Sequence, residues 1–195
     1  MQTQQKYYTP EEYLAREEAA EYKSEYIDGE IFPIAGGTTN HNQVAGNFSA
    51  ELIFAFKELD YRVFINDVRL WIPERRIYTY PDVMVVEGEP EYFEDDNTIT
   101  NPKIIVEVLS DSTKGYDRSD NFEAYRTIPS FVEYILLDQT KIHIEQYSKT
   151  ANKRWSFREY DAEDEAITLT SVDIEIALED IYNKVKFETV ETKEN

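Results

Sequence analysis

Residues 103–113 are KIIVEVLSDST, and the apolar run inside this stretch contains one carboxylate, Glu107. Both alternating faces of IIVEVL are apolar, which is typical of a central strand that is covered on both sides. The earlier stretch TYPDVMVVEG, at residues 79–88, is a second apolar run and has Asp82 set inside it. Because an unpaired buried carboxylate is costly, each acid needs a cation, a hydrogen-bond donor or an open cleft.

These two acids predict a divalent-metal site. One such acid more often forms a structural ion pair, whereas two on neighbouring central strands favour a functional site. The carboxylates of Asp82 and Glu107, with the backbone carbonyl of Val108, are ligands that suit Mg²⁺ or Mn²⁺. A divalent ion held there could activate a water molecule and stabilise charge on a phosphate. A zinc site is disfavoured, because the chain has no Cys and only 2 His.

Length and composition predict a globular protein. The 195 residues fit one domain, which we expect to span residues 1–195 with its core at about 22–182. Hydrophobic residues make up 41% of the chain, enough for a packed core. The N-terminus lacks the features of a signal peptide, and no stretch approaches the length of a membrane span. We therefore expect a cytoplasmic protein without a membrane partner.

The charge of the chain limits how it can bind nucleic acid. Forty acids face 20 bases, and the net charge of −20 disfavours nonspecific binding to phosphates. Any nucleic-acid site must therefore be a local basic groove. The most acidic runs are EGEPEYFEDDN (residues 87–97) and EYDAEDE (residues 159–165), and both are expected to be solvated loops.

The pattern along the chain predicts an α/β fold. A helix is expected to begin with Thr9 as N-cap and Pro10, followed by a hairpin that turns at Asp28-Gly29. A second helix is expected over about 40–59, with the apolar stripe Val44, Phe48, Leu52, Ala55 and Phe56. Strands are expected within 61–73, with a turn or bulge at Asn66-Asp67, and at 79–88, 102–110, 131–139 and 141–149.

A short helix is expected over about 117–127, and the tail predicts a strand pair with a terminal helical turn. Because strands and helices are interspersed, we expect a mixed sheet flanked by helices, with an N-terminal helix and hairpin and C-terminal additions.

Pro81-Asp82 followed by Glu107 resembles the PD-(D/E)XK nuclease pattern. Most of residues 22–182 also resembles the Uma2 family of endonucleases, through these stretches in order: EYIDGEIFPIAGGTTNHNQVAGN, TYPDVMVVEG, IIVEVLSDSTKGYDR, EAYRTIPSFVEYILLD and LEDIY. The resemblance implies a restriction-endonuclease-like fold and metal-dependent hydrolysis of phosphodiester bonds, with DNA as the nucleic-acid partner. It also implies that Asp82 and Glu107 are the metal ligands.

The chain departs from the pattern at its lysine. The general pattern has a Lys two residues after the Glu, and Leu109 stands there. Members of the Uma2 branch carry the Lys in a stretch like DRGDKF, and here DRSDNF has Asn121 instead. Helical spacing places Asn121 on the line of Ala124 and Tyr125, so its side chain is expected to point towards the two acids. Asn can donate a hydrogen bond but supplies neither positive charge nor a proton-transfer group.

Other residues near these motifs have two interpretations. Lys114, Arg118 and Lys103 could supply the missing charge, or each could be an ordinary loop or surface cation. His41 lies in the first turn of its helix and faces inward, either as a hydrogen-bonded structural histidine or as a proton carrier at the site. Glu30 is an auxiliary candidate in the hairpin motif, and His143 is expected on a strand surface.

Three functions fit the sequence. The first is a metal-dependent nuclease acting on DNA, in which Asn121 or a nearby cation positions water. The second is a nuclease-fold protein that has lost catalysis and serves as a binding or regulatory module, which Asn121 and the charge of −20 favour. The third is a structural domain whose two acids pair with Arg or Lys. Because cutting two strands suits a two-fold arrangement, we expect a homodimer.

Overall fold

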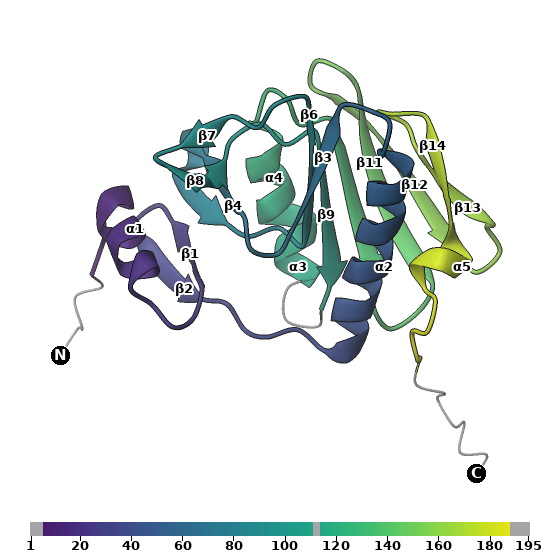
Figure 1. Ribbon diagram of the computed structural model, residues 1–195, viewed down its shortest axis with the longest axis horizontal. Coiled ribbons are helices and arrows are strands. Elements are labelled where there is room, and N and C mark those ends of the chain that lie inside the picture. Colours follow the sequence, from purple (N-terminus) through teal and green to yellow (C-terminus); the bar gives the residue numbers. More distant parts are fainter. Residues whose placement is uncertain (1–5, 111–113, 188–195) are drawn as a thin grey trace, which may run out of the picture.

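The structure is a computed structural model that describes residues 6–110 and 114–187 (Figure 1). It begins with helix α1 (Pro10–Glu18), strand β1 (Ser24–Ile27) and strand β2 (Glu30–Pro33). The Thr9 hydroxyl accepts from the Glu12 backbone N–H, and the Glu12 carboxylate accepts from that of Thr9, so the predicted cap is confirmed. Positive φ angles at Asp28 (42°) and Gly29 (104°) form the predicted hairpin turn.

Two six-stranded sheets make up most of the molecule. The first has the order β2-β1-β5-β4-β8-β7, with β4 (Arg69–Ile72), β5 (Ile77–Thr79), β7 (Tyr92–Phe93) and β8 (Asp95–Ile99). The second has the order β12-β11-β10-β9-β6-β3, with β3 (Tyr61–Ile65), β6 (Val83–Glu87), β9 (Ile104–Leu109), β10 (Glu133–Asp138), β11 (His143–Ala151) and β12 (Arg154–Asp161). In the second sheet β9 and β10 are parallel, and the other neighbours are antiparallel.

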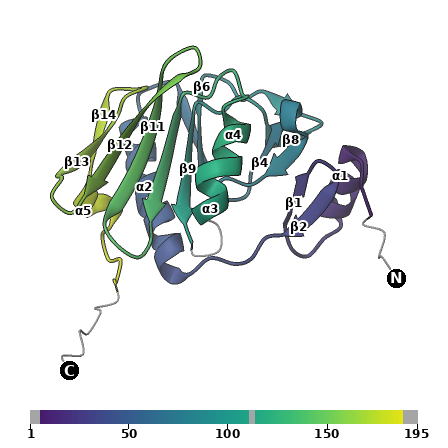
Figure 2. The same ribbon diagram turned by 180° about the vertical axis from the view of Figure 1, so that it is seen from behind.

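Helices cover both faces of the second sheet (Figures 1 and 2). On one face lie α2 (Thr39–Ala55), α5 (Leu178–Ile181) and the pair β13 (Ala166–Leu169) and β14 (Ile174–Ala177). On the other face lie α3 (Lys114–Tyr116), the π-helical segment η2 (Asp117–Asn121) and α4 (Phe122–Tyr125). All six residues of β9 are buried between these layers, as its two apolar faces predict. The predicted mixed sheet with flanking helices is confirmed.

Two hydrophobic clusters divide the side chains of the central strands as the alternation predicts. Val106 and Val108 pack with the α2 stripe, in which Val44, Phe48 and Leu52 are buried. On the other face, Ile105 and Leu109 pack with α4 and the first sheet. A smaller cluster of aromatic rings joins α1 to the first sheet and consists of Tyr13, Tyr26, Trp71 and Tyr78.

The prediction that the acidic runs are loops is correct for residues 88–91 and 162–165 and wrong for the parts of the two runs that form strands. EGEPEYFEDDN includes β7 and the start of β8, and EYDAEDE begins inside β12. In β8, Asp95 forms an ion pair with the buried Arg69 of β4, which also donates to the Thr98 hydroxyl. This pairing lets an acidic segment join the sheet. Strand β12 was not predicted, because most of its side chains are exposed and its apolar alternation is limited to Trp155 and Phe157.

Three boundaries also differ from expectation. Helix α2 ends at Ala55, four residues before the predicted end, since Phe56 takes the C-cap position. The stretch 61–73 is divided between the two sheets, with the predicted turn at Asn66, where φ is 52°. The helix expected over 117–127 begins at Lys114 instead and passes through η2. Residues 111–113 of the quoted stretch lie outside the described residues. Within the described ranges, no helix has the length and apolar character to cross a membrane.

Candidate active site

The antiparallel pairing of β6 and β9 brings the two predicted acids together. Val83 is opposite Val106, so Asp82 and Glu107 occupy the next positions along the two strands. The Asp82 backbone N–H donates to Glu107 Oε2 at 3.1 Å, and the Val108 N–H donates to Asp82 Oδ2 at 2.8 Å. Each carboxylate is therefore anchored by the backbone of the other strand.

Glu107 lies in a buried and negative environment. Only 8% of the residue is exposed, and its Oε1 accepts a hydrogen bond of 2.7 Å from the Tyr125 hydroxyl. Burial, followed by the charges of Asp82 and Asp117, raises the pKa of the Glu107 carboxyl well above its usual value, although the Tyr125 hydrogen bond opposes this change. A cation placed here would remove much of that electrostatic cost.

His41 is a titratable base beside this pair. Its Nε2 lies 3.2 Å from Asp82 Oδ2, while its backbone N–H donates to the Thr38 hydroxyl at the start of α2. Burial disfavours the protonated ring, but the hydrogen bond and charge of Asp82, with smaller contributions from Asp117 and the Val108 backbone, raise the His41 pKa. The positive form of His41 is thus favoured beside Asp82.

Gly37, before α2, leaves room for the His41 imidazole. A Cβ at Gly37 would lie 3.0 Å from His41 Nδ1, closer than side chains normally pack. Of the two interpretations of His41, the geometry favours a residue of the site over a capping histidine alone.

Asn121 faces inward as expected, but its hydrogen-bond partner is a third acid. Its Nδ2 donates to Asp117 Oδ1 at 2.9 Å, and both residues are buried in η2. The charge of Asp117 contributes to the raised pKa values of Glu107 and His41, which places this carboxylate close to the predicted pair. Asp117 was missed by sequence reasoning, because its stretch was assigned to the loop and helix start around the lysine position.

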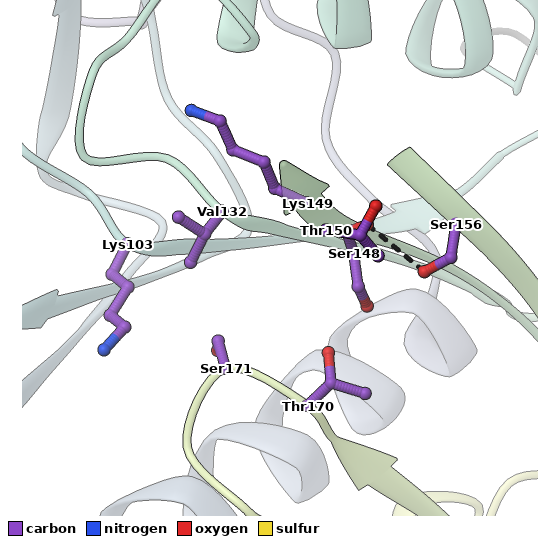
Figure 3. A pocket seen from close by; sticks show the side chains of 8 residues that line it. All are labelled: Lys103, Val132, Ser148, Lys149, Thr150, Ser156, Thr170 and Ser171. Carbon is purple, nitrogen blue, oxygen red and sulfur yellow. Dashed lines mark hydrogen bonds between the residues drawn. The ribbon is translucent and has the colours of Figure 1, made fainter. Parts of the chain in front are cut away.

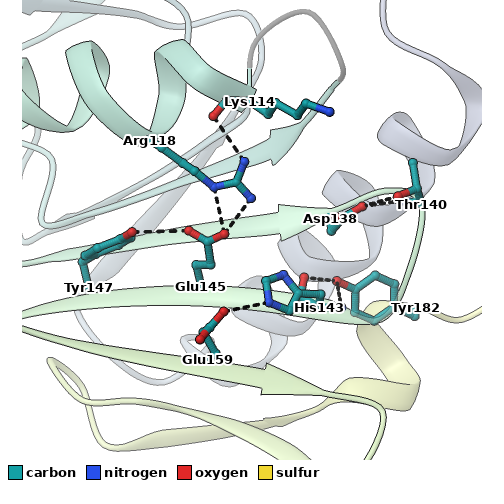
Figure 4. Close-up of polar contacts among 9 residues, drawn as sticks. All are labelled: Lys114, Arg118, Asp138, Thr140, His143, Glu145, Tyr147, Glu159 and Tyr182. Atoms are coloured by element: carbon teal, nitrogen blue, oxygen red, sulfur yellow. Dashed lines mark hydrogen bonds and ion pairs between the residues drawn. The ribbon is translucent and has the colours of Figure 1, made fainter.

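The neighbouring cations differ in their placement. Arg118 donates from Nε and Nη2 to Glu145 Oε1 at 2.8 and 2.6 Å, on β11 (Figure 4). Lys103 bonds Glu87 Oε2 at 2.8 Å and the Tyr61 hydroxyl at 3.1 Å, before the start of β9. The side chains of Arg118 and Lys103 therefore bind groups other than Asp82 and Glu107. The exposed Lys114 begins α3, and its carbonyl accepts from Arg118 Nη1 at 3.4 Å.

The N-terminal hairpin also carries Glu25, which was not predicted as a site residue. The Glu25 carboxylate accepts from the Thr79 hydroxyl, and burial raises its pKa. Its charge also helps to raise the pKa of Tyr125, the partner of Glu107, which places it near the site. Alternation along β1 could have suggested this, since Glu25 lies on the opposite face from the buried Tyr26. The predicted surface residue His143 is half-buried on β11, with Nε2 3.1 Å from Glu159 Oε1 (Figure 4).

A separate pocket of about 430 Å³ lies near the other end of β9 (Figure 3). Two lysines and five Ser or Thr residues line it, but the Lys103 and Lys149 ammonium groups point in different directions. The Thr170 and Ser171 hydroxyls donate to the buried Glu133 carboxylate. The pocket therefore does not combine its donors into an anion site.

Asp82 and Glu107 are the residues that could hold a divalent cation. Among the described residues, no group of three or more His, Cys, Asp or Glu side chains is arranged so that it could hold a metal ion. Mg²⁺ nevertheless keeps several waters and often uses only one or two carboxylates. The donor set therefore fits a hard ion completed by water and substrate oxygens, and it does not fit a closed all-protein cage.

Comparisons with known proteins agree with this fold. The model of the family Uma2, described as "Putative restriction endonuclease", matches residues 10–179. Two uncharacterized proteins of Synechocystis are 43% and 34% identical to this chain over 167 and 179 residues. The first alignment covers 85% of this chain and 94% of the relative, and the second covers 92% and 93%.

A solved structure from Anabaena variabilis, titled a "putative nuclease belonging to DUF820", superposes with a TM-score of 0.70. The superposition covers 90% of this chain and 97% of that one at 18% sequence identity, so it shows a shared fold.

Proposed function

This chain belongs to the Uma2 family of restriction-endonuclease-like proteins, and on that basis we propose that it is a metal-dependent nuclease that hydrolyses phosphodiester bonds in DNA. The observation that supports this most is the pairing of Asp82 with Glu107 at neighbouring strand positions, where each is anchored by the backbone of the other strand. The paired carboxylates of Asp82 and Glu107, with the charge of Asp117 also acting on Glu107, create a demand for positive charge, which a divalent ion would meet.

The Asp82 and Glu107 carboxylates and the Val108 carbonyl would hold Mg²⁺ or Mn²⁺, which when bound supplies an activated water and stabilises phosphate charge. His41, whose Nε2 lies 3.2 Å from Asp82 Oδ2, would act as a proton carrier beside these ligands. Glu107, fixed at both oxygens, keeps its carboxylate oriented during the reaction. We further propose one domain over residues 1–195, a cytoplasmic location and a homodimer.

A second candidate function is a nuclease-fold binding or regulatory module with impaired catalysis. The Asn121 amide is bound to Asp117 and carries no charge towards a phosphate. Loss of a preorganised charge costs on the order of 10²–10³ in rate. The net charge of −20 also opposes binding to a polyanion.

A plasmid-nicking assay in Mn²⁺ separates the two functions. The proteins are wild type, Asp82→Ala and Asn121→Lys, with Glu123→Gln on the exposed side of α4 as a surface-acid control. Under the nuclease proposal, wild type and the control nick the plasmid and Asp82→Ala does not. If only Asn121→Lys nicks, the natural chain is the impaired form. Nicking by Asp82→Ala at the wild-type rate would refute the assignment of the site.

Metal binding is tested separately by calorimetric titration of Mn²⁺ into wild type and Glu107→Ala. Both proposed functions predict binding by wild type and loss of binding in the variant. Wild type that binds no Mn²⁺ would rule out the proposed metal site and favour a structural domain.

A further inference from the structure

Tyr125 is a buried residue of α4 whose hydroxyl is directed at the acid pair. The hydroxyl donates to Glu107 Oε1 at 2.7 Å, while the Asp82 N–H donates to Glu107 Oε2 at 3.1 Å. Two donors on the two oxygens fix both the position and the rotation of the carboxylate plane. Each oxygen keeps a further lone pair, so this arrangement leaves the carboxylate able to bind a cation.

The irregular helix before α4 aligns Tyr125 with the rest of the site. In a regular α-helix, Asp117 and Tyr125 would be displaced by about 80° around the axis, because eight residues are not a whole number of turns. The π-helical segment η2 takes in an extra residue within its turn. Asp117, Asn121 and Tyr125 are consequently all buried on the side that faces the sheet.

The neighbouring buried tyrosines have different partners. The Tyr134 hydroxyl donates to the Asp117 carbonyl at 3.1 Å, and the Tyr160 hydroxyl donates to Gln146 Oε1 at 2.8 Å. Among the hydrogen bonds of the described residues, Tyr125 therefore supplies the side-chain donor to Glu107. Tyr160, on another part of the sheet, carries a buried hydroxyl that can serve as a control for that of Tyr125.

We propose that Tyr125 is a positioning residue that holds the Glu107 carboxylate in the orientation needed to bind a divalent metal ion. The proposal rests on the metal site of the proposed function. Donors that orient a metal ligand from outside its coordination sphere typically contribute 10- to 100-fold to metal affinity. A hydroxyl that only satisfied a buried carboxylate would contribute to stability and leave metal affinity unchanged.

The test is calorimetric titration of Mn²⁺ into full-length wild type, Tyr125→Phe and Tyr160→Phe, with folding checked by circular dichroism. We expect Tyr125→Phe to bind Mn²⁺ about 10- to 100-fold more weakly, and Tyr160→Phe to bind as wild type does. Both substitutions remove one buried hydroxyl, so the comparison separates metal positioning from a general loss of stability. Tyr125→His, which keeps a ring N–H donor, should recover part of the affinity and provides the readout if Tyr125→Phe does not fold.

Two outcomes overturn the proposal in different ways. Equal Mn²⁺ affinity in wild type and a folded Tyr125→Phe, an equal loss in Tyr160→Phe, or a folded Tyr125→His that has lost Mn²⁺ binding completely, would overturn the positioning role and leave the metal site intact. No Mn²⁺ binding by wild type would overturn the metal site itself, and the positioning role with it.

Discussion

The raised pKa of Glu107 predicts that the metal-free protein becomes less stable as pH increases. An ordinary Glu has a pKa of 4.5, and burial with the charges of Asp82 and Asp117 moves the folded-state value well above it. Between the unfolded and folded pKa values, the folded chain binds more protons than the unfolded chain. The stability contributed by protonated Glu107 is therefore fully present below pH 4.5 and is lost as pH rises through the folded pKa.

The size of the effect follows from the linkage between proton binding and folding. Each pKa unit by which the folded value exceeds the unfolded value lowers the free energy of unfolding by about 1.4 kcal/mol. This full loss is reached at a pH where Glu107 is ionised in both the folded and the unfolded chain. For a chain of this length, that corresponds to a fall in Tm of about 3–5 °C per unit. His41 acts with the same sign in a higher window, because its pKa is raised above 6.5 and its stabilising charge is lost as pH rises through the folded value.

The assay is thermal unfolding followed by circular dichroism in the presence of a chelator, from pH 4.5 to pH 8. We compare wild type with Glu107→Gln, which keeps the shape of the side chain but cannot ionise. The Tm of wild type should fall across this range more steeply than that of Glu107→Gln, with the difference growing above pH 4.5. Glu123→Gln serves as the control, since its exposed ion pair with Arg75 has little energetic weight.

Parallel curves of Tm against pH for wild type and Glu107→Gln would refute this reasoning. They would mean that Glu107 ionises at nearly the same pH in the folded and unfolded chains, and that the site does not concentrate negative charge on this carboxylate. A steeper fall in the control Glu123→Gln than in wild type would show instead that general surface charge dominates the pH dependence.

Two further predictions concern the framework that positions the site. Leu52→Ala removes a fully buried side chain of α2 from the cluster that packs against β9. Chemical denaturation should show that the free energy of unfolding falls by about 2–5 kcal/mol. A fall below about 1 kcal/mol would mean that the core collapses around the gap. Thr9→Ala removes the cap of α1, and chemical denaturation should show that the free energy of unfolding falls by about 1 kcal/mol. The plasmid-nicking rate should not change, and an altered rate would connect α1 to the site.

The acid pair was predictable because its signal is local in sequence. Glu107 inside the apolar strand β9 and Asp82 directly before the apolar strand β6 violate the expected pattern, and the cost of burying such carboxylates indicates a candidate site before any fold is known. Spacing along the following helix also predicted that residues 121 and 125 face the sheet. These inferences need only the period of a strand or helix and the physical cost of charge burial.

The partners of these residues depend in part on how separate elements approach one another. Tyr125 was predicted to face the sheet, while its bond to Glu107 depends on the packing of α4 against β9. The partner of Asn121 is local instead, because Asp117 lies four residues earlier in the same helical segment, a spacing at which side chains are neighbours, so this pairing could have been predicted. The first sheet was missed in part because Arg69, distant in sequence, neutralises Asp95 of β8.

The outermost strands of the second sheet have a consequence for solubility. Within the described sheet order, β3 and β12 each have one neighbour, so one side of each backbone is available to pair with another chain. Exposed Arg158 and Glu159 on β12, with a net charge of −20 on each copy, oppose such stacking between molecules. This repulsion is screened within about 3 Å at 1 M salt. The acidic surface, which disfavours binding to phosphates, thus protects the open sheet edges from aggregation. That protection weakens as the salt concentration increases.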